Sequence, residues 1–325
     1  MPLYTTENKN DERGMSMSSC KVRIGYACIN LSLGKKFRTF RWKSIEDQDI
    51  QKIKEVIQHN IILLGDIIYD NIKKNIFVYR VTAEIIPFID KPEIKKLIEK
   101  HKILSEPKIQ NEFERIRKWQ KQYNLRISMH SSHFTMLASP KEDIVQRSIG
   151  ELRAQSEFLK RIGGQNLVIH IGGAYGNKVE TLERFKENLK THKSEIDVER
   201  LTIENDDKTY TSEEVVRLCK ELGLKWVYDY HHERCNPSKY ANIIELLREY
   251  PPNKYHLSSG IGDIIKPPHA DYILKEDMEG LINQLDLAGI KQADIIFEAK
   301  KKDLSIFEVM EPTENGYWKI KTTKL

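Results

Sequence analysis

The feature that most restricts the fold of this chain is a regular alternation of short apolar runs with longer segments of helical periodicity. The apolar runs are rich in β-branched and aromatic residues, as expected for strands that are buried on both faces. Eight of them follow one another along the 325 residues, at 22–29, 76–86, 125–130, 166–171, 200–204, 225–229, 254–257 and 294–299. This eightfold alternation predicts an α/β fold, a single (β/α)8 TIM barrel.

The segments between these runs carry recognisable helix ends. Helices are predicted at 45–64, 148–162, 212–222, 238–249 and 276–287, and glycine or proline, which end helices, follows each of them closely. An open, doubly wound sheet is the alternative fold. Such a sheet would usually show a Gly-rich phosphate loop after its first strand. The residues from Tyr26 to Asn30 contain no glycine, so the barrel is favoured.

The barrel is expected to take up most of the chain. Residues 20–302 are predicted to form it, residues 1–19 to be a disordered extension, and residues 303–325 to be an appended element. Residues 91–116 are interpreted as a helical insertion. No run of 18 uninterrupted apolar residues occurs, and the polar N-terminal segment is unlike a secretory signal. We therefore expect a protein of the cytoplasm without a membrane partner.

Side chains with metal-ligand chemistry stand at the carboxyl ends of consecutive predicted strands. In a barrel, these ends converge on one rim, where the active site lies. Imidazole and carboxylate ligands together suit Zn²⁺, Mn²⁺ or Fe²⁺, and Glu204 is placed to bridge two ions. Two or three adjacent ions are the usual apparatus for displacement at phosphorus, so a metal-dependent phosphodiesterase is predicted. The set comprises His130, His170, Glu204, Asp229, His232, Lys254, His256 and Glu298.

The chain also resembles a known family along nearly the whole barrel, from about Arg23 to Lys300. The matching stretches are RIGY at 23–26, Asn30, YR at 79–80, IPF at 86–88, SMH at 128–130, VIHIGG at 168–173, END at 204–206, DYHH at 229–232, KYHLS at 254–258, PHADY at 268–272 and EAK at 298–300. No single stretch is specific, but the ordered set is. On this basis the chain is identified as a member of the UV damage endonucleases.

The resemblance implies an activity and a set of cofactors. Members of the family cut DNA on the 5′ side of a lesion and leave 3′-hydroxyl and 5′-phosphate ends. Their substrates are pyrimidine dimers, 6-4 photoproducts and often abasic sites in double-stranded DNA. Two or three divalent ions are implied, with Mn²⁺ preferred over Zn²⁺ or Mg²⁺, and no small organic cofactor. A protein with this activity is expected to act as a monomer and to associate with the nucleoid when it acts.

The resemblance also implies a role for individual residues. One ion would take His130, His170 and Glu204, and a second would take Glu204, Asp229, His256 and Glu298. A third would take His232 and His269. Glu204, Lys254 and His256 are the implied catalytic residues, and Lys254 matches a lysine that can be carboxylated. The alternative for Lys254 is an ordinary lysine that contacts phosphate.

DNA contacts are expected from other positions on the same rim. Lys35, Lys36, Arg38 and Arg41 follow the first strand and suit phosphate contacts that give affinity without sequence readout. The net charge of +5 permits a polyanionic partner without requiring one. The remaining candidates are Tyr26 and Asn30 for flipped nucleotides, Arg80, and the pair His133 and Phe134.

Two positions depart from the family pattern. His133 and Phe134 stand where the family usually has a Gln-Tyr pair that wedges into the duplex. Asp90 and Lys91 stand where it often has Ser-His, so a histidine near the scissile phosphate is replaced by a lysine. Both changes concern lesion preference.

Three other functions fit parts of the pattern. An abasic-site endonuclease without photoproduct activity would use the same metal ligands. A metal-dependent sugar isomerase would share the barrel and its rim but needs a small closed pocket. A DNA-binding barrel with structural metal ions would unfold on chelation, whereas an enzyme of this size should stay folded.

Overall fold

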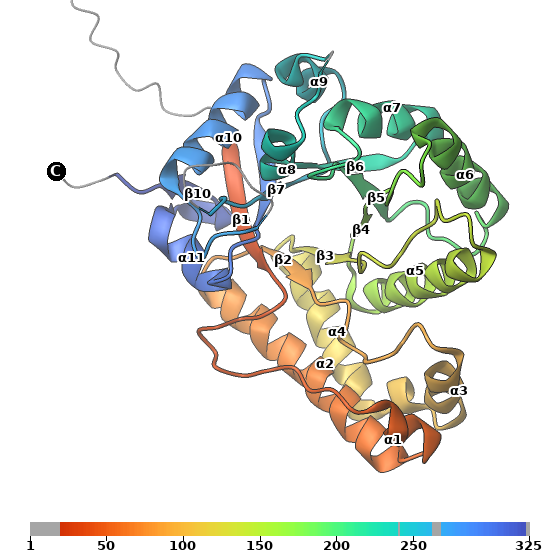
Figure 1. The fold of residues 1–325 in the computed structure, drawn as a ribbon. Coiled ribbons are helices and arrows are strands. Elements are labelled where there is room, and N and C mark those ends of the chain that lie inside the picture. Colours follow the sequence, from red (N-terminus) through yellow and green to blue (C-terminus); the bar gives the residue numbers. More distant parts are fainter. Residues whose placement is uncertain (1–19, 240, 262–267, 323–325) are drawn as a thin grey trace, which may run out of the picture.

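The computed structural model describes residues 20–239, 241–261 and 268–322, and its centre is a ring of eight parallel strands (Figure 1). The ring closes because β1 pairs with both β2 and β8. The predicted (β/α)8 barrel is therefore confirmed. The barrel strands are β1 (Lys21–Ala27), β2 (Val78–Val81), β3 (Arg126–His130), β4 (Asn166–Ile169), β5 (Leu201–Glu204), β6 (Lys225–Asp229), β7 (Lys254–Leu257) and β8 (Gln292–Phe297).

Helices surround the strand ring on its outside (Figure 1). They pack on it through a large apolar core, which contains residues such as Ile53, Leu152 and Trp226. The interior of the ring holds a separate small apolar cluster of Ala27, Val78 and Ile296. The helices are α1 (Trp42–Glu46), α2 (Ile50–Lys73), α3 (Pro92–Lys100), α4 (Pro107–Gln122), α5 (Glu142–Ile162), α6 (Lys178–Thr191), α7 (Ser212–Leu222), α8 (Tyr230–Cys235), α9 (Ile243–Glu249), α10 (Lys275–Leu287) and α11 (Lys302–Val309), with 3₁₀ turns at Ile103–Ser105 and Glu314–Gly316.

One predicted helix end is wrong. The first long helix was expected to stop at Gly65, but α2 continues to Lys73. Gly65 serves packing instead, because a Cβ there would lie 1.5 Å from a carboxylate oxygen of Glu112 on α4. The glycine lets α4 approach α2 closely, and the helix ends only before Asn75, whose φ of 64° is left-handed.

The ends of the chain add to the barrel in different ways. Residues 1–19, predicted to be disordered, lie outside the described residues. After α11, β9 (Met310–Pro312) and β10 (Trp318–Ile320) form an antiparallel pair, and β10 joins β1 through Val22 and Trp318. None of the helices in the described part of the chain is long and apolar enough to cross a membrane.

The amino-terminal half of the barrel interior contains a buried ionic network. Arg23 Nε and Nη2 donate to the two carboxylate oxygens of Asp294, at 2.6 and 2.8 Å. Arg126 Nε lies 3.1 Å from the same carboxylate and extends its guanidinium to Asn253. One carboxylate thus compensates two guanidinium groups beneath the functional rim.

Candidate metal centre

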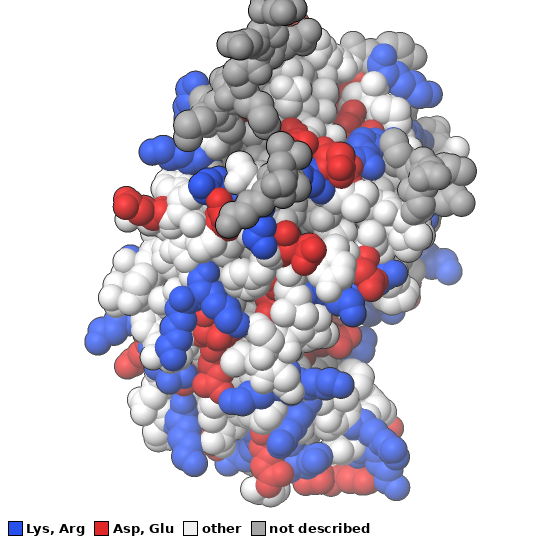
Figure 2. Space-filling view, turned by 90° about the vertical axis from the view of Figure 1, so that its left-hand side faces the viewer, with Lys and Arg blue, Asp and Glu red and all other residues white. Residues whose placement is uncertain are grey.

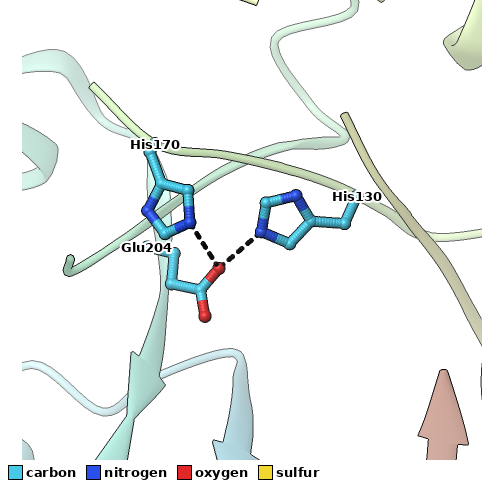
Figure 3. Close-up of side chains that lie close together, drawn as sticks. All are labelled: His130, His170 and Glu204. Atoms are coloured by element: carbon cyan, nitrogen blue, oxygen red, sulfur yellow. Dashed lines mark hydrogen bonds and ion pairs between the residues drawn. The ribbon is translucent and has the colours of Figure 1, made fainter. Parts of the chain in front are cut away.

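Two groups of potential metal ligands lie together at the carboxyl ends of the strands. The first is His130, His170 and Glu204, and the second is Glu204, Asp229, His256 and Glu298; within each group the ligand atoms lie within 4.8 Å of one another. Figure 3 shows both imidazoles of the first group pointing at the Glu204 carboxylate, with Nε2–Oε2 distances of 2.7 Å for His130 and 3.5 Å for His170. Glu204 belongs to both groups, which is the geometry that a bridging carboxylate needs.

Three histidines at the rim are oriented by backbone carbonyl oxygens. The Nδ1 of His130 lies 2.8 Å from Ser131 O, that of His232 lies 3.0 Å from Asn205 O, and that of His269 lies 2.8 Å from Glu298 O. Because a carbonyl oxygen only accepts, each Nδ1 donates a proton. Nε2 is therefore the atom of each ring that is left for an ion, once it has lost any proton that it carries, which is how metal-binding histidines are usually oriented.

A short helix brings Asp229 and His232 to the same site. Asp229 caps α8, and its side chain accepts from His232 N–H at 2.8 Å. His232 Nδ1 lies 3.9 Å from both Asp229 Oδ2 and Glu204 Oε1. The ring of His269 lies 6.5 Å from the ring of His232, so this pair borders the two larger groups.

The buried carboxylates of the site stay ionised. Burial alone would raise the pKa of Glu204, but His256 and His170 outweigh it and hold the pKa well below its usual range. Burial opposes ionisation of Glu298 in the same way, and the Arg80 guanidinium and His256 lower its pKa well below its usual range. Both carboxylates therefore keep their negative charge inside the site.

Two of the histidines hold protons in return. Burial lowers the pKa of His256, but Glu204 and Glu298 outweigh it and raise the pKa to about 9. Burial is likewise outweighed at His232, where Asp229 and Glu204 raise the pKa to about 9. In the metal-free protein, the protons on these two histidines thus neutralise part of the carboxylate charge that metal ions could neutralise instead.

Buried polar atoms at the site test whether metal ions would fit. Among the described residues, Asp229 Oδ2 and His256 Nε2 are buried without a hydrogen-bond partner. Buried polar atoms rarely stay unpaired in native proteins. A mixed set of imidazole and carboxylate donors without cysteine suits divalent ions such as Mn²⁺ or Zn²⁺. The residues present fit the predicted cofactors.

Lys254 and Arg80 lie inside the barrel, next to this site. Lys254 is fully buried, and within the described part of the chain its Nζ has no hydrogen-bond partner. Burial and the neighbouring Arg126 hold the pKa of Lys254 well below its usual range. Arg80, predicted to contact DNA, instead pairs its Nη1 with Glu298 Oε1, and its side chain is only 13% exposed.

The other predicted DNA contacts divide into buried and exposed residues. Tyr26 and Asn30 are buried, and Asn30 Nδ2 donates to Tyr26 Oη at 2.9 Å, so neither offers a free face for a nucleotide. Lys35 and Arg38 are exposed, and Lys35 pairs with Asp66 at 2.8 Å. Lys36 and Arg41 are exposed as well. Basic and acidic side chains are mixed over the face seen in Figure 2.

His133 and Phe134 stand out on the loop after β3. Phe134 is 59% exposed, and its ring lies 3.9 Å from the ring of His133. Phe134 also lines a cavity of about 410 Å³ between the loops after β2 and β3. Lys91 lines this cavity too, and its Nζ pairs with Asp90 at 2.7 Å.

Several residues of the site were missed in the sequence. Asn205 donates from Nδ2 to Asp229 O at 3.0 Å and accepts from Asp229 N–H at 2.8 Å, which joins the ends of β5 and β6. Its position directly after Glu204 was a usable signal. Gln155 on α5 contacts the hydroxyl of Ser131, the residue after His130, and no local sequence signal marks it.

Comparison with known proteins agrees with this architecture. The family model "UV-endonuclease UvdE" matches residues 22–324. The UV DNA damage endonuclease of Bacillus cereus strain B4264 is 32% identical over 314 residues, covering 89% of this chain and 94% of the relative. The crystal structure of SacUVDE superposes with a TM-score of 0.74 at 27% identity, covering 87% of this chain and 95% of that one.

A more distant structure shares the fold alone. Endonuclease IV from Thermus thermophilus superposes with a TM-score of 0.53 at 15% identity, over 88% of this chain and 96% of that one. The family match, by contrast, runs across the whole barrel and includes every ligand of the candidate metal centre. The chain belongs to the UV-endonuclease UvdE family.

Proposed function

We propose that this chain is a metal-dependent DNA repair endonuclease, and we assign the activity to the barrel of residues 20–302. It nicks double-stranded DNA on the 5′ side of UV photoproducts and leaves 3′-hydroxyl and 5′-phosphate ends. The observation that carries the proposal is Glu204, which stands in both ligand groups at the rim of a barrel of this family. We further propose that the protein acts as a monomer.

The chain would hold the ions with the residues already described. His130 and His170 would share one ion with Glu204, and Asp229, His256 and Glu298 would hold a second one with it, while His232 and His269 are available to a third. Divalent ions, with Mn²⁺ as the first candidate, polarise a phosphodiester and lower the pKa of a bound water. Arg80 and the backbone carbonyls fix the orientation of the ligand side chains.

Lys254 would act inside the barrel and away from phosphate. Its amine is buried and its pKa is well below the usual range, so it is not an exposed cation that could bind a DNA phosphate. Such an amine is poised for carboxylation by carbon dioxide, which would provide a further oxygen ligand. We therefore favour the carboxylated form over a lysine that contacts phosphate.

Defined lesions separate this function from the abasic-site alternative. Duplexes that each carry one cyclobutane dimer, one 6-4 photoproduct or one abasic site should be incubated with the chain and Mn²⁺. We expect cutting immediately 5′ to both photoproducts, with ends that a ligase accepts. Cutting at the abasic site alone would contradict the photoproduct function and favour the alternative.

Metal binding should depend on pH. His256 and His232 keep their protons up to about pH 9 in the metal-free protein, so an incoming ion must displace them. The affinities for the second and the third Mn²⁺ should each rise with pH, by up to about tenfold per pH unit while the displaced proton is bound. Calorimetry in two buffers of different ionisation enthalpy should show proton release near neutral pH, and a His101→Gln control should match wild type. Mn²⁺ binding by wild type without proton release would contradict the assignment.

Phe134 should matter for lesions but not for the metal centre. Phe134→Ala is expected to weaken nicking of photoproduct DNA by about 5- to 150-fold, because stacking of a base on an aromatic ring is worth roughly 1–3 kcal/mol. Its Mn²⁺ stoichiometry should equal that of wild type. Tyr69→Ala is the matched control, since Tyr69 is an aromatic residue, 47% exposed, on α2. Equal nicking by the two variants would exclude the role of Phe134 in recognition.

A further inference from the structure

The chain leaves β1 through a strained turn beside the candidate metal centre. Ile29 N–H donates to Ala27 O at 2.9 Å, which closes a three-residue turn around Cys28, whose φ is 69°. A γ-turn with positive φ is rare, and it is costly for a residue with a side chain. Neighbours hold it in place, because Cys28 N–H donates to Arg80 O at 2.8 Å and Tyr79 Oη donates to Cys28 O at 2.5 Å.

The residues after this turn rest on a buried scaffold. Asn30 is 1% exposed, and its amide is held by the hydroxyl of Tyr26. Asp303 on α11 is fully buried and accepts from the backbone N–H groups of Leu31 at 2.6 Å and Ser32 at 3.2 Å. The buried polar atoms of Asn30 and Asp303 thus hold the short loop that follows the turn at Cys28.

This scaffold presents two aliphatic side chains to solvent. Ile29 is 43% exposed and Leu31 is 39% exposed, on either side of the buried Asn30. Single exposed aliphatic residues are common on protein surfaces. Here, however, a strained turn and a buried carboxylate hold a pair of them outward, and strained backbone of this kind gathers at functional sites.

The surroundings of the pair indicate what it contacts. Lys35 and Arg38 follow it on the same loop and are exposed, and Lys35 pairs with Asp66, so basic groups that can bind an anion lie on the same loop as the aliphatic pair. Arg38 is fixed as well, because Asn60 accepts from its backbone N–H at 2.7 Å and donates to its carbonyl at 2.9 Å. Apolar side chains beside basic ones suit duplex DNA, where Ile and Leu can press against bases and sugars while Lys and Arg bind phosphates.

The strand that leads into the pair ends next to the candidate metal centre. Ala27, two residues before Ile29, is aligned with Arg80 on β2, and Arg80 contacts the carboxylate of Glu298. Strand β2 separates β1 from β3, which carries Phe134 after its end. The aliphatic pair and Phe134 thus belong to loops on either side of the β2 end.

We propose that Ile29 and Leu31 form a second apolar contact with the duplex, against the sugar and base faces of nucleotides next to the lesion. This rests on the proposed DNA function and extends it, because it assigns lesion affinity to side chains outside the metal centre and outside the loop after β3. The buried Asn30 and Asp303 act as positioning residues, since they hold the loop and do not touch DNA.

The test compares two double variants of the full chain. In Ile29→Ser/Leu31→Ser the proposed contact is removed, whereas Val179→Ser/Leu287→Ser removes two aliphatic side chains elsewhere that are 69% and 57% exposed. Fluorescence anisotropy without added metal measures binding to a duplex with one cyclobutane dimer and to the matched intact duplex over a salt series. Lys35→Gln serves as a reference for a phosphate contact.

We expect the loop variant to bind the lesion duplex at least about tenfold more weakly, because apolar burial is lost. Its salt slope, melting temperature and Mn²⁺ stoichiometry should match wild type, while Lys35→Gln should reduce the salt slope by about 1. Equal lesion affinity of the two double variants would overturn the inference alone. A wild type that does not distinguish the lesion duplex would overturn the proposed function together with it. If the double variant fails to fold, Leu31→Ala provides the same comparison.

Discussion

Replacing Glu204 with glutamine is expected to abolish nicking of UV-irradiated plasmid. The substitution keeps the shape of the side chain but removes the charge that both ligand groups share. Loss of a residue that only orients a metal ligand typically costs 10–100-fold, so loss of the shared ligand should exceed about 100-fold. Initial nicking rates over a Mn²⁺ series measure this, together with metal content.

The fold should survive this change, which makes the result interpretable. In the metal-free protein His256 and His170 stabilise the ionised Glu204, so Glu204→Gln should lower the melting temperature while its far-UV circular dichroism matches wild type. Glu99→Gln is the control, because Glu99 is exposed on α3. Full activity of Glu204→Gln at wild-type metal content would show that the ligand assignment is wrong.

Replacing Asp294 with alanine should have the largest effect on stability. Asp294 is the carboxylate that Arg23 contacts through two hydrogen bonds and Arg126 through a third contact, at 2.6, 2.8 and 3.1 Å. Its loss leaves the buried guanidinium of Arg23 and the partly buried guanidinium of Arg126 uncompensated. Removal of one partner of a buried ion pair typically costs about 3–5 kcal/mol of the free energy of unfolding, which chemical denaturation can measure.

Two further variants separate charge burial from simple side-chain loss. Glu279→Ala breaks an exposed pair with Lys275, and it should cost no more than about 1 kcal/mol. Adding Arg23→Met to Asp294→Ala should recover part of the loss, because one uncompensated charge disappears. If Asp294→Ala is no more harmful than Glu279→Ala, the network does not stabilise the barrel.

Local sequence signals were sufficient for the strands and for several helix ends. The segment 212–222 is found as α7 with the same bounds, because Thr211 and Glu214 form a capping box and Gly223 takes a left-handed φ of 66°. Both signals depend on residues next to the helix. Gly65 misled the prediction because its role depends on α4, nearly fifty residues away, which local periodicity does not reveal.

The same distinction explains which site residues could be predicted. The ligands stand at strand ends, and the closed barrel brings all strand ends to one rim, so their assembly follows from topology. The orientation of Arg80 could not be predicted, because it depends on a carboxylate 218 residues away. The burial of Tyr26 likewise depends on Asn71 in α2, whose Oδ1 accepts from its hydroxyl at 2.8 Å.

The proposed function depends most directly on whether lesions and metal ions are both needed for strand cleavage. Supercoiled plasmid, either UV-irradiated or unirradiated, should be incubated with the full chain and Mn²⁺, with and without a chelator, and relaxed circles counted. We predict relaxation of the irradiated plasmid with Mn²⁺, little relaxation of the unirradiated plasmid, and none of either with chelator. Equal relaxation of both plasmids, or relaxation that survives chelation, would contradict the account.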